Sequence, residues 1–175
     1  FETGGGTVMT NPYTTATGRG QYLFGTLVDL GFIERGQSTP PPGEGEWEGI
    51  RWTGMGGVSS RSEFIASQHA QDLALETFTA DNWRVIQGTA QSAPPMNGIP
   101  MTQGGAQLVA HLLGAGGYQD WVASAYDASA LPQDVISANG GLARIEEELE
   151  NRIAAGAGIP PGSAAFQACA PSEYD

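Results

Sequence analysis

The 175-residue sequence contains no lysine and a single cysteine. Its seven basic residues are arginines that stand singly, whereas nineteen residues are acidic, so the formal net charge is −12. A protein that neutralises nucleic-acid phosphates needs a basic stripe, and adhesion to anionic lipid needs basic residues too. The composition therefore argues against nucleic acid and membrane surfaces as partners.

The same shortages exclude several kinds of site. A phosphate-binding P-loop needs a lysine. A structural zinc site or an internal disulfide needs more than one cysteine, and Cys169 is the single cysteine of the sequence. His69 and His111 lie far apart, and neither belongs to a His-Glu-x-x-His helix. No window approaches 18 uninterrupted apolar residues, so no membrane insertion is predicted. We expect neither a metal nor another cofactor.

Glycine and proline are abundant, with 26 and 11 residues, and they predict long irregular connections. Residues 1–23, 37–57 and 88–101 have no usable hydrophobic period and are expected to form loops and turns. Trp47 and Trp52 both lie in the second of these segments. Each either anchors the loop by packing or faces a ligand.

Hydrophobic periodicity elsewhere predicts a mainly α chain. Helices are expected from Thr26, from Ser60 or Ser62 to about residue 87 with a break near residues 79–81, from Thr102 to Gly114, over 118–126, and over 141–155. In the last helix, Leu142, Ile145, Leu149 and Ile153 fall on one stripe, which places the neighbouring glutamates mostly in solvent. We predict a single domain over residues 1–155 and a C-terminal tail over 156–175.

Carboxylates are the remaining groups with catalytic potential. Cleavage of a glycosidic bond needs a carboxylic acid close to the leaving oxygen. Glu2 opens a Glu-Thr-Gly-Gly segment, which is followed by Asn11-Pro12 and then by Gly18-Arg19-Gly20-Gln21. This order resembles the signature of the soluble lytic transglycosylases of the lysozyme superfamily. In that family a glutamate before Ser-Gly-Gly leads through an Asn-Pro loop to Gly-x-x-Gln and an aromatic or aliphatic residue, and here Thr3 replaces the serine.

The resemblance continues downstream to about residue 125. The segment 68–72 and the pair Asn82-Trp83 are similar to the middle helices of the phage and secretion-system branch of that family. Residues 110–117, Ala-His-Leu-Leu-Gly-Ala-Gly-Gly, are similar to the Ala-His-Leu-Gly-Gly form that this branch uses in its third motif.

The resemblance implies a lysozyme-like domain with long Gly/Pro-rich loops that cleaves the β-1,4 bond between N-acetylmuramic acid and N-acetylglucosamine. Glu2 would protonate the glycosidic oxygen and then assist the muramic 6-hydroxyl in attacking the anomeric carbon. Gln21, Tyr22 and His111 would bind the glycan strand. The resemblance further implies an enzyme that needs no cofactor and is virion-associated or extracytoplasmic, in the periplasm, where it degrades the wall locally with carrier proteins of a virion or secretion apparatus.

Two alternatives stay open. A two-carboxylate hydrolase would pair Glu2 with Glu34 or with one of Glu44, Glu46 and Glu48, at about 5–5.5 Å for a retaining enzyme or about 6.5–9.5 Å for an inverting one. A non-catalytic structural or wall-binding component of a phage tail or secretion machine would retain the fold alone. Because peptidoglycan is often anionic, a chain of charge −12 is not drawn to it by long-range attraction, and we expect a carrier to deliver it.

Overall fold

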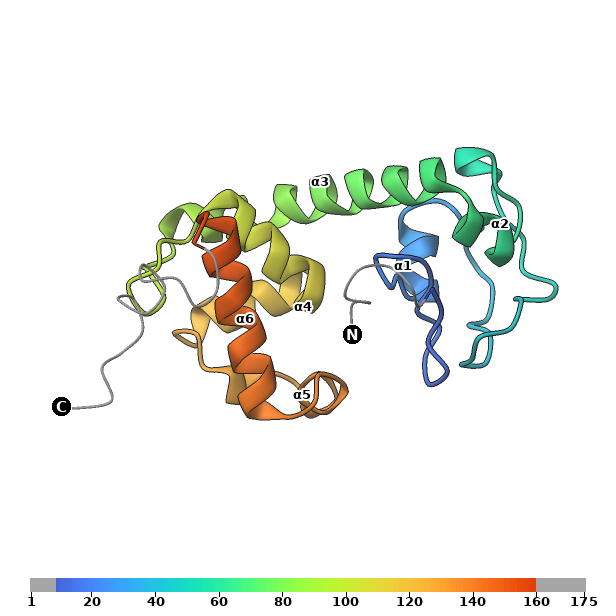
Figure 1. Ribbon diagram of the computed structural model, residues 1–175. Coiled ribbons are helices and arrows are strands. Elements are labelled where there is room, and N and C mark those ends of the chain that lie inside the picture. The colour runs from blue at the N-terminus through green and yellow to red at the C-terminus, as the bar shows by residue number, and fades with distance from the viewer. Residues whose placement is uncertain (1–8, 160–175) are drawn as a thin grey trace. The chain divides into compact units, whose positions relative to one another are not determined.

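The computed structural model describes residues 9–159, and the fold is mainly helical (Figure 1). The helices are α1 (Phe24–Asp29), α2 (Arg61–Ala66), α3 (Gln68–Ser92), α4 (Gln103–Ala123), α5 (Gln133–Ala138) and α6 (Leu142–Gly156), with short 3-10 turns η1 (Met55–Gly57) and η2 (Ala128–Ala130). The mainly α class is confirmed, whereas the lysozyme-like fold stays a prediction. No helix within residues 9–159 is long and apolar enough to cross a membrane.

The chain divides into two compact units between Phe78 and Thr79. Unit 1 is described from residue 9 to Phe78 and contains α1, α2 and the first part of α3. Unit 2 is described from Thr79 to residue 159 and contains the rest of α3 with α4, α5 and α6. The predicted single domain over 1–155 stays a prediction, and residues 160–175 of the predicted tail lie outside the described residues.

Aromatic rings build the core of unit 1. Phe24 and Trp47 meet edge to face with ring centroids 5.4 Å apart, and Phe32 and Phe64 do so at 5.3 Å. Edge-to-face pairs of this kind contribute beyond the apolar area that they bury. Trp47 is 5 % exposed and stacks on Trp52 at 6.1 Å. Trp47 therefore anchors the irregular loop over residues 37–57 to the core.

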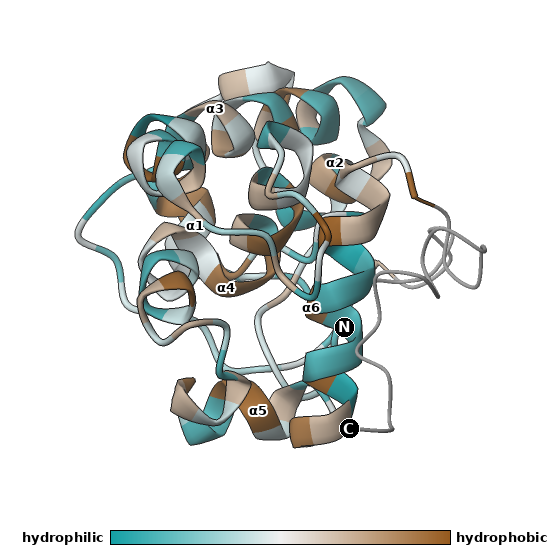
Figure 2. Ribbon diagram, turned by 90° about the vertical axis from the view of Figure 1, so that its left-hand side faces the viewer, coloured by the Kyte–Doolittle hydropathy of each residue, from teal (hydrophilic) through white to brown (hydrophobic). Residues whose placement is uncertain are grey.

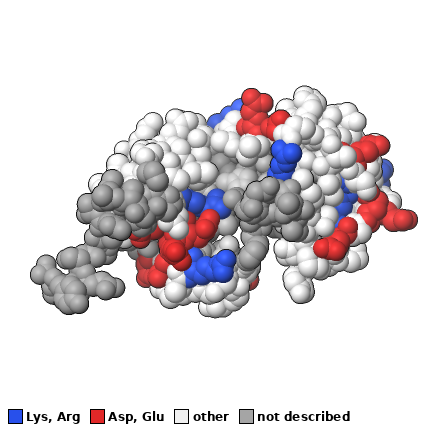
Figure 3. Space-filling model, viewed as in Figure 1, with Lys and Arg blue, Asp and Glu red and all other residues white. Residues whose placement is uncertain are grey.

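Unit 2 is organised around the crossing of α4 and α6. Ile145, Leu149 and Ile153 are fully buried, as the stripe on α6 predicts, but Leu142 is 40 % exposed because it begins the helix. Hydrophilic residues cover much of the opposite side of α6 (Figure 2). Figure 3 shows acidic side chains in patches on each unit, with basic side chains scattered singly among them.

The helix starts expected at Ser60 and Thr102 are confirmed, whereas the start expected at Thr26 is wrong, because α1 begins at Phe24 after Leu23 and has no side-chain cap. The Ser60 side chain accepts from the backbone N–H of Glu63 at the start of α2, and the Thr102 side chain accepts from that of Gly105 at the start of α4. A side chain in this position satisfies an N–H that has no partner in the first turn.

Other expected boundaries are wrong. The break in the long helix lies at Ser67 and not near residues 79–81, where α3 runs on without interruption. Gly114 (φ 74°, ψ 167°) kinks α4 without ending it, so the helix expected over 118–126 is the second part of α4. The helix α5 was not expected, because six residues are too few to show a helical period.

Candidate functional site

Gln21 lies in a tight turn over residues 18–21 that closes a small antiparallel hairpin. Thr17 and Tyr22 exchange backbone hydrogen bonds, each of 3.0 Å. A second bridge joins Thr10 to Thr17, and the N–H of Gly18 donates to the carbonyl of Met9 at 2.8 Å. The hairpin is thus connected to the segment that follows the Glu-Thr-Gly-Gly motif, while Glu2 itself lies outside the described residues.

The packing of this turn explains its two glycines. Gly18 has φ +76°, and a Cβ there would lie 2.9 Å from both Oε1 of Gln71 and a ring carbon of Phe64. A Cβ at Gly20 would lie 2.5 Å from the ring of Tyr22. Real Cβ atoms do not approach other atoms so closely. The Gly-x-Gly-Gln spacing is therefore a steric requirement of the turn.

Gln21 and Tyr22 have different environments. Gln21 is half-buried with φ +49°, and both its backbone N–H and its side-chain Nε2 donate to the carbonyl of Gly18, at 3.1 and 2.9 Å. Tyr22 is 4 % exposed, and its ring packs edge to face on Phe78 at 5.7 Å. The ring of Tyr22 supports the turn from the core, and its contact with a sugar stays a prediction.

A buried arginine holds the hairpin in place. Arg61 is 1 % exposed, and its Nε donates to Oγ1 of Thr17 at 2.8 Å. Its two Nη atoms donate to the carbonyls of Ala16, Gly43 and Gly45 at 2.6 to 3.2 Å. Burial lowers the pKa of Arg61, while the nearby acidic residues Glu46 and Glu44 oppose this shift. Sequence reasoning missed this residue, since an arginine at the first position of a helix gives no sign that it is buried.

Helix α3 holds the turn from another side through Gln71. The side chain of Gln71 is 5 % exposed, and its Oε1 accepts from the backbone N–H of Arg19 at 2.7 Å. Its Nε2 donates to the carbonyl of Ile65 at 2.8 Å. A buried amide is costly unless its polar atoms are hydrogen-bonded, and here both are.

His111 lies in unit 2, on α4, and is half-buried. The neighbouring carbonyl of Ala110 accepts from Nδ2 of Asn82 at 3.3 Å, and Asn82 is 8 % exposed on α3. The kink at Gly114 follows within the same segment. The role of His111 as a glycan contact stays a prediction.

Helix α3 therefore carries one buried amide to each motif-bearing segment. Gln71 reaches the Gly18–Gln21 turn within unit 1, and Asn82 reaches the Ala110–His111 segment within unit 2. Both amides belong to the segments that resemble the middle helices of the transglycosylase family, and neither periodicity nor spacing indicates what they contact.

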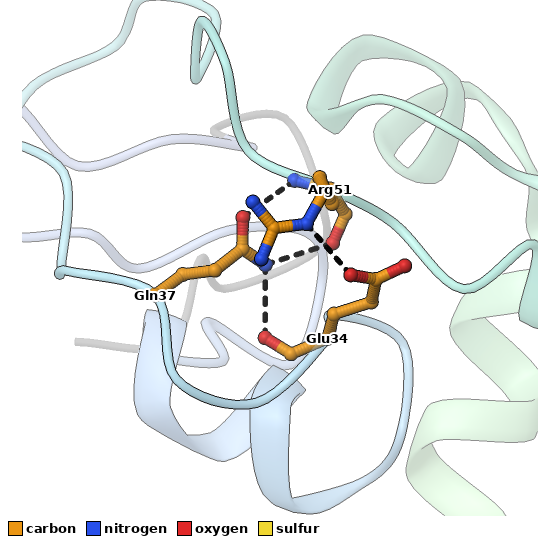
Figure 4. Close-up of polar contacts among 3 residues, drawn as sticks. All are labelled: Glu34, Gln37 and Arg51. Atoms are coloured by element: carbon orange, nitrogen blue, oxygen red, sulfur yellow. Dashed lines mark hydrogen bonds and ion pairs between the residues drawn. The ribbon is translucent and has the colours of Figure 1, made fainter.

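Two of the four glutamates that could act as a second catalytic carboxylate, Glu34 and Glu46, already have partners within the structure. Figure 4 shows Glu34 paired with Arg51, whose Nε lies 2.7 Å from Oε2 of Glu34, with Gln37 bonded to the backbone of both. The side chain of Glu34 is 48 % exposed. Glu44 and Glu48 are exposed as well.

Glu46 joins the loop to the start of α2. Its Oε1 accepts from the N–H of Arg61, and its Oε2 accepts from the N–H and hydroxyl of Ser62. Partial burial raises the pKa of Glu46, but the hydrogen bonds from Ser62 and from other backbone amides together outweigh it, so the pKa lies below its ordinary value. A carboxyl held in this way stays ionised and is a poor proton donor.

Within residues 9–159, no group of three or more His, Cys, Asp or Glu side chains is arranged to hold a metal ion. Comparison of the chain with known protein families, with curated proteins and with solved structures finds no match.

Proposed function

We propose that the chain is a peptidoglycan-cleaving lytic transglycosylase or muramidase that acts on the bond between N-acetylmuramic acid and N-acetylglucosamine. The supporting observation is that α3 carries a buried amide to each of two separate motif segments, Gln71 to the Gly18–Gln21 turn and Asn82 to the Ala110–His111 segment. Polar groups are buried in this way where a defined backbone geometry must be maintained.

In this mechanism Glu2 is the general acid and base. It protonates the glycosidic oxygen and then removes the proton from the attacking hydroxyl, which is the muramic 6-hydroxyl in a transglycosylase or water in a muramidase. Gln21 and His111 supply hydrogen bonds to the sugars, and Tyr22 keeps the turn that carries Gln21 in shape. A two-carboxylate hydrolase is the weaker proposal, because Arg51 already pairs Glu34 and α2 already engages Glu46.

A second candidate is a non-catalytic wall-binding or structural component of a phage tail or secretion machine. The net charge of −12 favours it, because a freely diffusing acidic enzyme is repelled by an anionic wall, whereas a component of a larger assembly is brought to the wall by its neighbours. We place both candidates in a virion or in the periplasm, next to peptidoglycan.

The test is Glu2→Gln, with Glu76→Gln on the exposed surface of α3 as the matched control. Loss of a general acid lowers the rate by about 10²-fold or more. We therefore expect zymogram activity on purified peptidoglycan to disappear with Glu2→Gln and to persist with Glu76→Gln. Activity that survives Glu2→Gln would rule out this mechanism, and a wild-type chain that binds peptidoglycan without cleaving it would favour the second candidate.

Mass spectrometry of the released fragments separates the two enzymatic outcomes. A 1,6-anhydro end identifies the transglycosylase reaction, and a reducing end identifies hydrolysis.

A further inference from the structure

The peptide group between Gly18 and Arg19 is hydrogen-bonded on both sides. Its N–H, from Arg19, donates to Oε1 of Gln71 at 2.7 Å. Its carbonyl, from Gly18, accepts from the backbone N–H and from Nε2 of Gln21. A trans peptide group is planar, and its N–H and C=O point in opposite directions. The direction that Gln71 imposes on the N–H therefore fixes the direction of the carbonyl that holds the Gln21 side chain.

Gln71 is itself rigidly placed. Its Nε2 donates to the carbonyl of Ile65 near the end of α2, which leaves its Oε1 aimed at Arg19. Gly18 packs closely against this amide, since a Cβ added there would lie 2.9 Å from that Oε1. The hydrogen bond from the Arg19 N–H to Oε1 of Gln71 also polarises the Gly18–Arg19 peptide group. This polarisation makes the Gly18 carbonyl a stronger acceptor for Gln21.

The Gln21 amide keeps one polar atom for a ligand. Its Nε2 is used by Gly18, whereas its Oε1 makes no hydrogen bond to any residue in the described part of the chain. The side chain is half-buried, so this oxygen has a restricted orientation. A sugar hydroxyl or acetamido N–H is a donor of the kind that a carbonyl oxygen binds.

We propose that Gln71 is a positioning residue: it does not touch the glycan but sets, through the Gly18–Arg19 peptide, the orientation in which Gln21 binds a sugar. This role rests on the function proposed above and adds to it a residue that lies far from the turn in sequence. Misplacement of a substrate contact by about 1 Å can cost about 10²-fold in rate.

Gln71 also has a structural role, since it caps a carbonyl at the end of α2. A purely structural role and a positioning role differ in how their effects combine. If Gln71 acts through Gln21, removal of Gln21 abolishes what Gln71 contributes, and the two substitutions are not additive. If Gln71 only stabilises the fold, the two losses multiply.

The experiment compares Gln71→Leu, Gln21→Ala and the double variant in the full chain, with Gln91→Leu on the exposed surface of α3 as the control. The measured quantity is the initial rate of fragment release from purified peptidoglycan. We expect each single variant to lose roughly 10- to 100-fold in rate, the double variant to lose no more than the worse single one, and Gln91→Leu to remain at the wild-type rate. Multiplicative losses would overturn the positioning role.

Gln71→Glu replaces Gln71→Leu as the test variant if Gln71→Leu folds poorly in a thermal unfolding scan. The glutamate keeps an acceptor for Arg19 but loses the donor to Ile65, so we expect it to recover part of the rate. A folded Gln71→Glu that loses as much rate as Gln21→Ala would count against the role.

A readout independent of activity separates this role from the proposed function. In ¹⁵N NMR spectra, Gln71→Leu should shift the side-chain amide signal of Gln21 and speed hydrogen exchange at the Arg19 amide, whereas Gln91→Leu should change neither. An unshifted Gln21 signal overturns the coupling even in an active enzyme. If the wild type is as inactive as Glu2→Gln, the enzymatic function is overturned, and so is the proposed contact between Gln21 and a sugar. In that case the NMR shift still tests whether Gln71 is coupled to Gln21.

Discussion

Glu46 stabilises the junction between the loop over residues 37–57 and α2 only while it is ionised. Its pKa lies below the ordinary value of 4.5 because hydrogen bonds from Ser62 and backbone amides outweigh the effect of partial burial. A carboxyl with a depressed pKa in the folded state contributes stability above its unfolded pKa and loses that contribution as the pH falls through its folded pKa. The stabilising effect therefore belongs to neutral pH and disappears in acid.

The corresponding prediction compares wild type with Glu46→Gln. We expect Glu46→Gln to lower the midpoint of thermal unfolding at pH 7, and the difference to shrink as the pH is reduced below about 4.5. Glu48→Gln, in the same loop, is the control and should show little difference at pH 7. A difference between wild type and Glu46→Gln that stays constant from pH 7 to pH 3 would contradict the role of the ionised carboxylate.

Arg61 shows why arginine is suited to this position. Its guanidinium donates to Thr17 and to three carbonyls while lying 4.6 Å from the ring centroid of Trp47. An arginine presents five donors in a planar fork, whereas a lysine presents three on a compact ammonium group. A lysine in this place would leave buried carbonyls without donors.

At the scale of elements, the crossing of α4 and α6 depends on glycines. A Cβ at Gly156 would lie 2.0 Å from the nitrogen of Gly105 and 2.3 Å from its Cα. These are backbone atoms, so no side-chain rotation relieves the overlap. The two helices approach each other this closely only because neither carries a Cβ at the contact.

We expect Gly156→Ala to destabilise unit 2 by about 1–3 kcal/mol or more, since the helices must move apart. Gly88→Ala on α3 is the matched control, because a Cβ added at Gly88 would have no other part of the structure within 4 Å. Since alanine favours a helix over glycine, this variant should stabilise the chain by about 0.5–1 kcal/mol. Urea denaturation followed by circular dichroism measures both. Equal midpoints for the two variants would show that the crossing is not tightly packed.

The sequence predicts those elements whose signal is local. Side-chain caps at Ser60 and Thr102 and the apolar stripe of Ile145, Leu149 and Ile153 are confirmed. The continuation of α4 through Gly114 was not predicted, because a glycine with positive φ commonly ends a helix, and here packing in unit 2 retains the helix beyond it.

The candidate site was predictable only in part. The Gly-x-Gly-Gln pattern identifies the turn, and the structure gives its steric reason in Gly18 and Gly20. The contacts of Gln71, Asn82 and Arg61 join residues far apart in the chain, and no periodicity or spacing carries that information. The catalytic assignment of Glu2 lies outside the described residues and stays a proposal.

At the scale of the whole molecule, the negative charge bears on the function proposed above. The net charge is −12 and the sequence contains no lysine. Figure 3 shows acidic patches on each unit. Repulsion between exposed charges is screened over about 10 Å at 0.1 M salt. Approach to an anionic wall should therefore become easier as salt is added.

We predict that the cleavage rate of the free chain rises between low and moderate ionic strength. The measurement is fragment release from whole peptidoglycan across a salt series, and peptidoglycan stripped of its attached anionic polymers should show a smaller rise. A rate that only falls over this range would contradict the prediction.

The tryptophans give each unit its own optical signal. Trp47 and Trp52 lie in unit 1 with nearly parallel rings, 20° apart in plane and 6.1 Å between centroids, while Trp83 and Trp121 lie in unit 2, where Trp121 meets Tyr126 edge to face. Two indoles so close and so aligned couple their electronic transitions, and near-ultraviolet circular dichroism detects such fixed packing and loses it when tertiary structure is lost. The stacked pair that anchors the loop over residues 37–57 is thus also a built-in chromophore that reports the packing of unit 1.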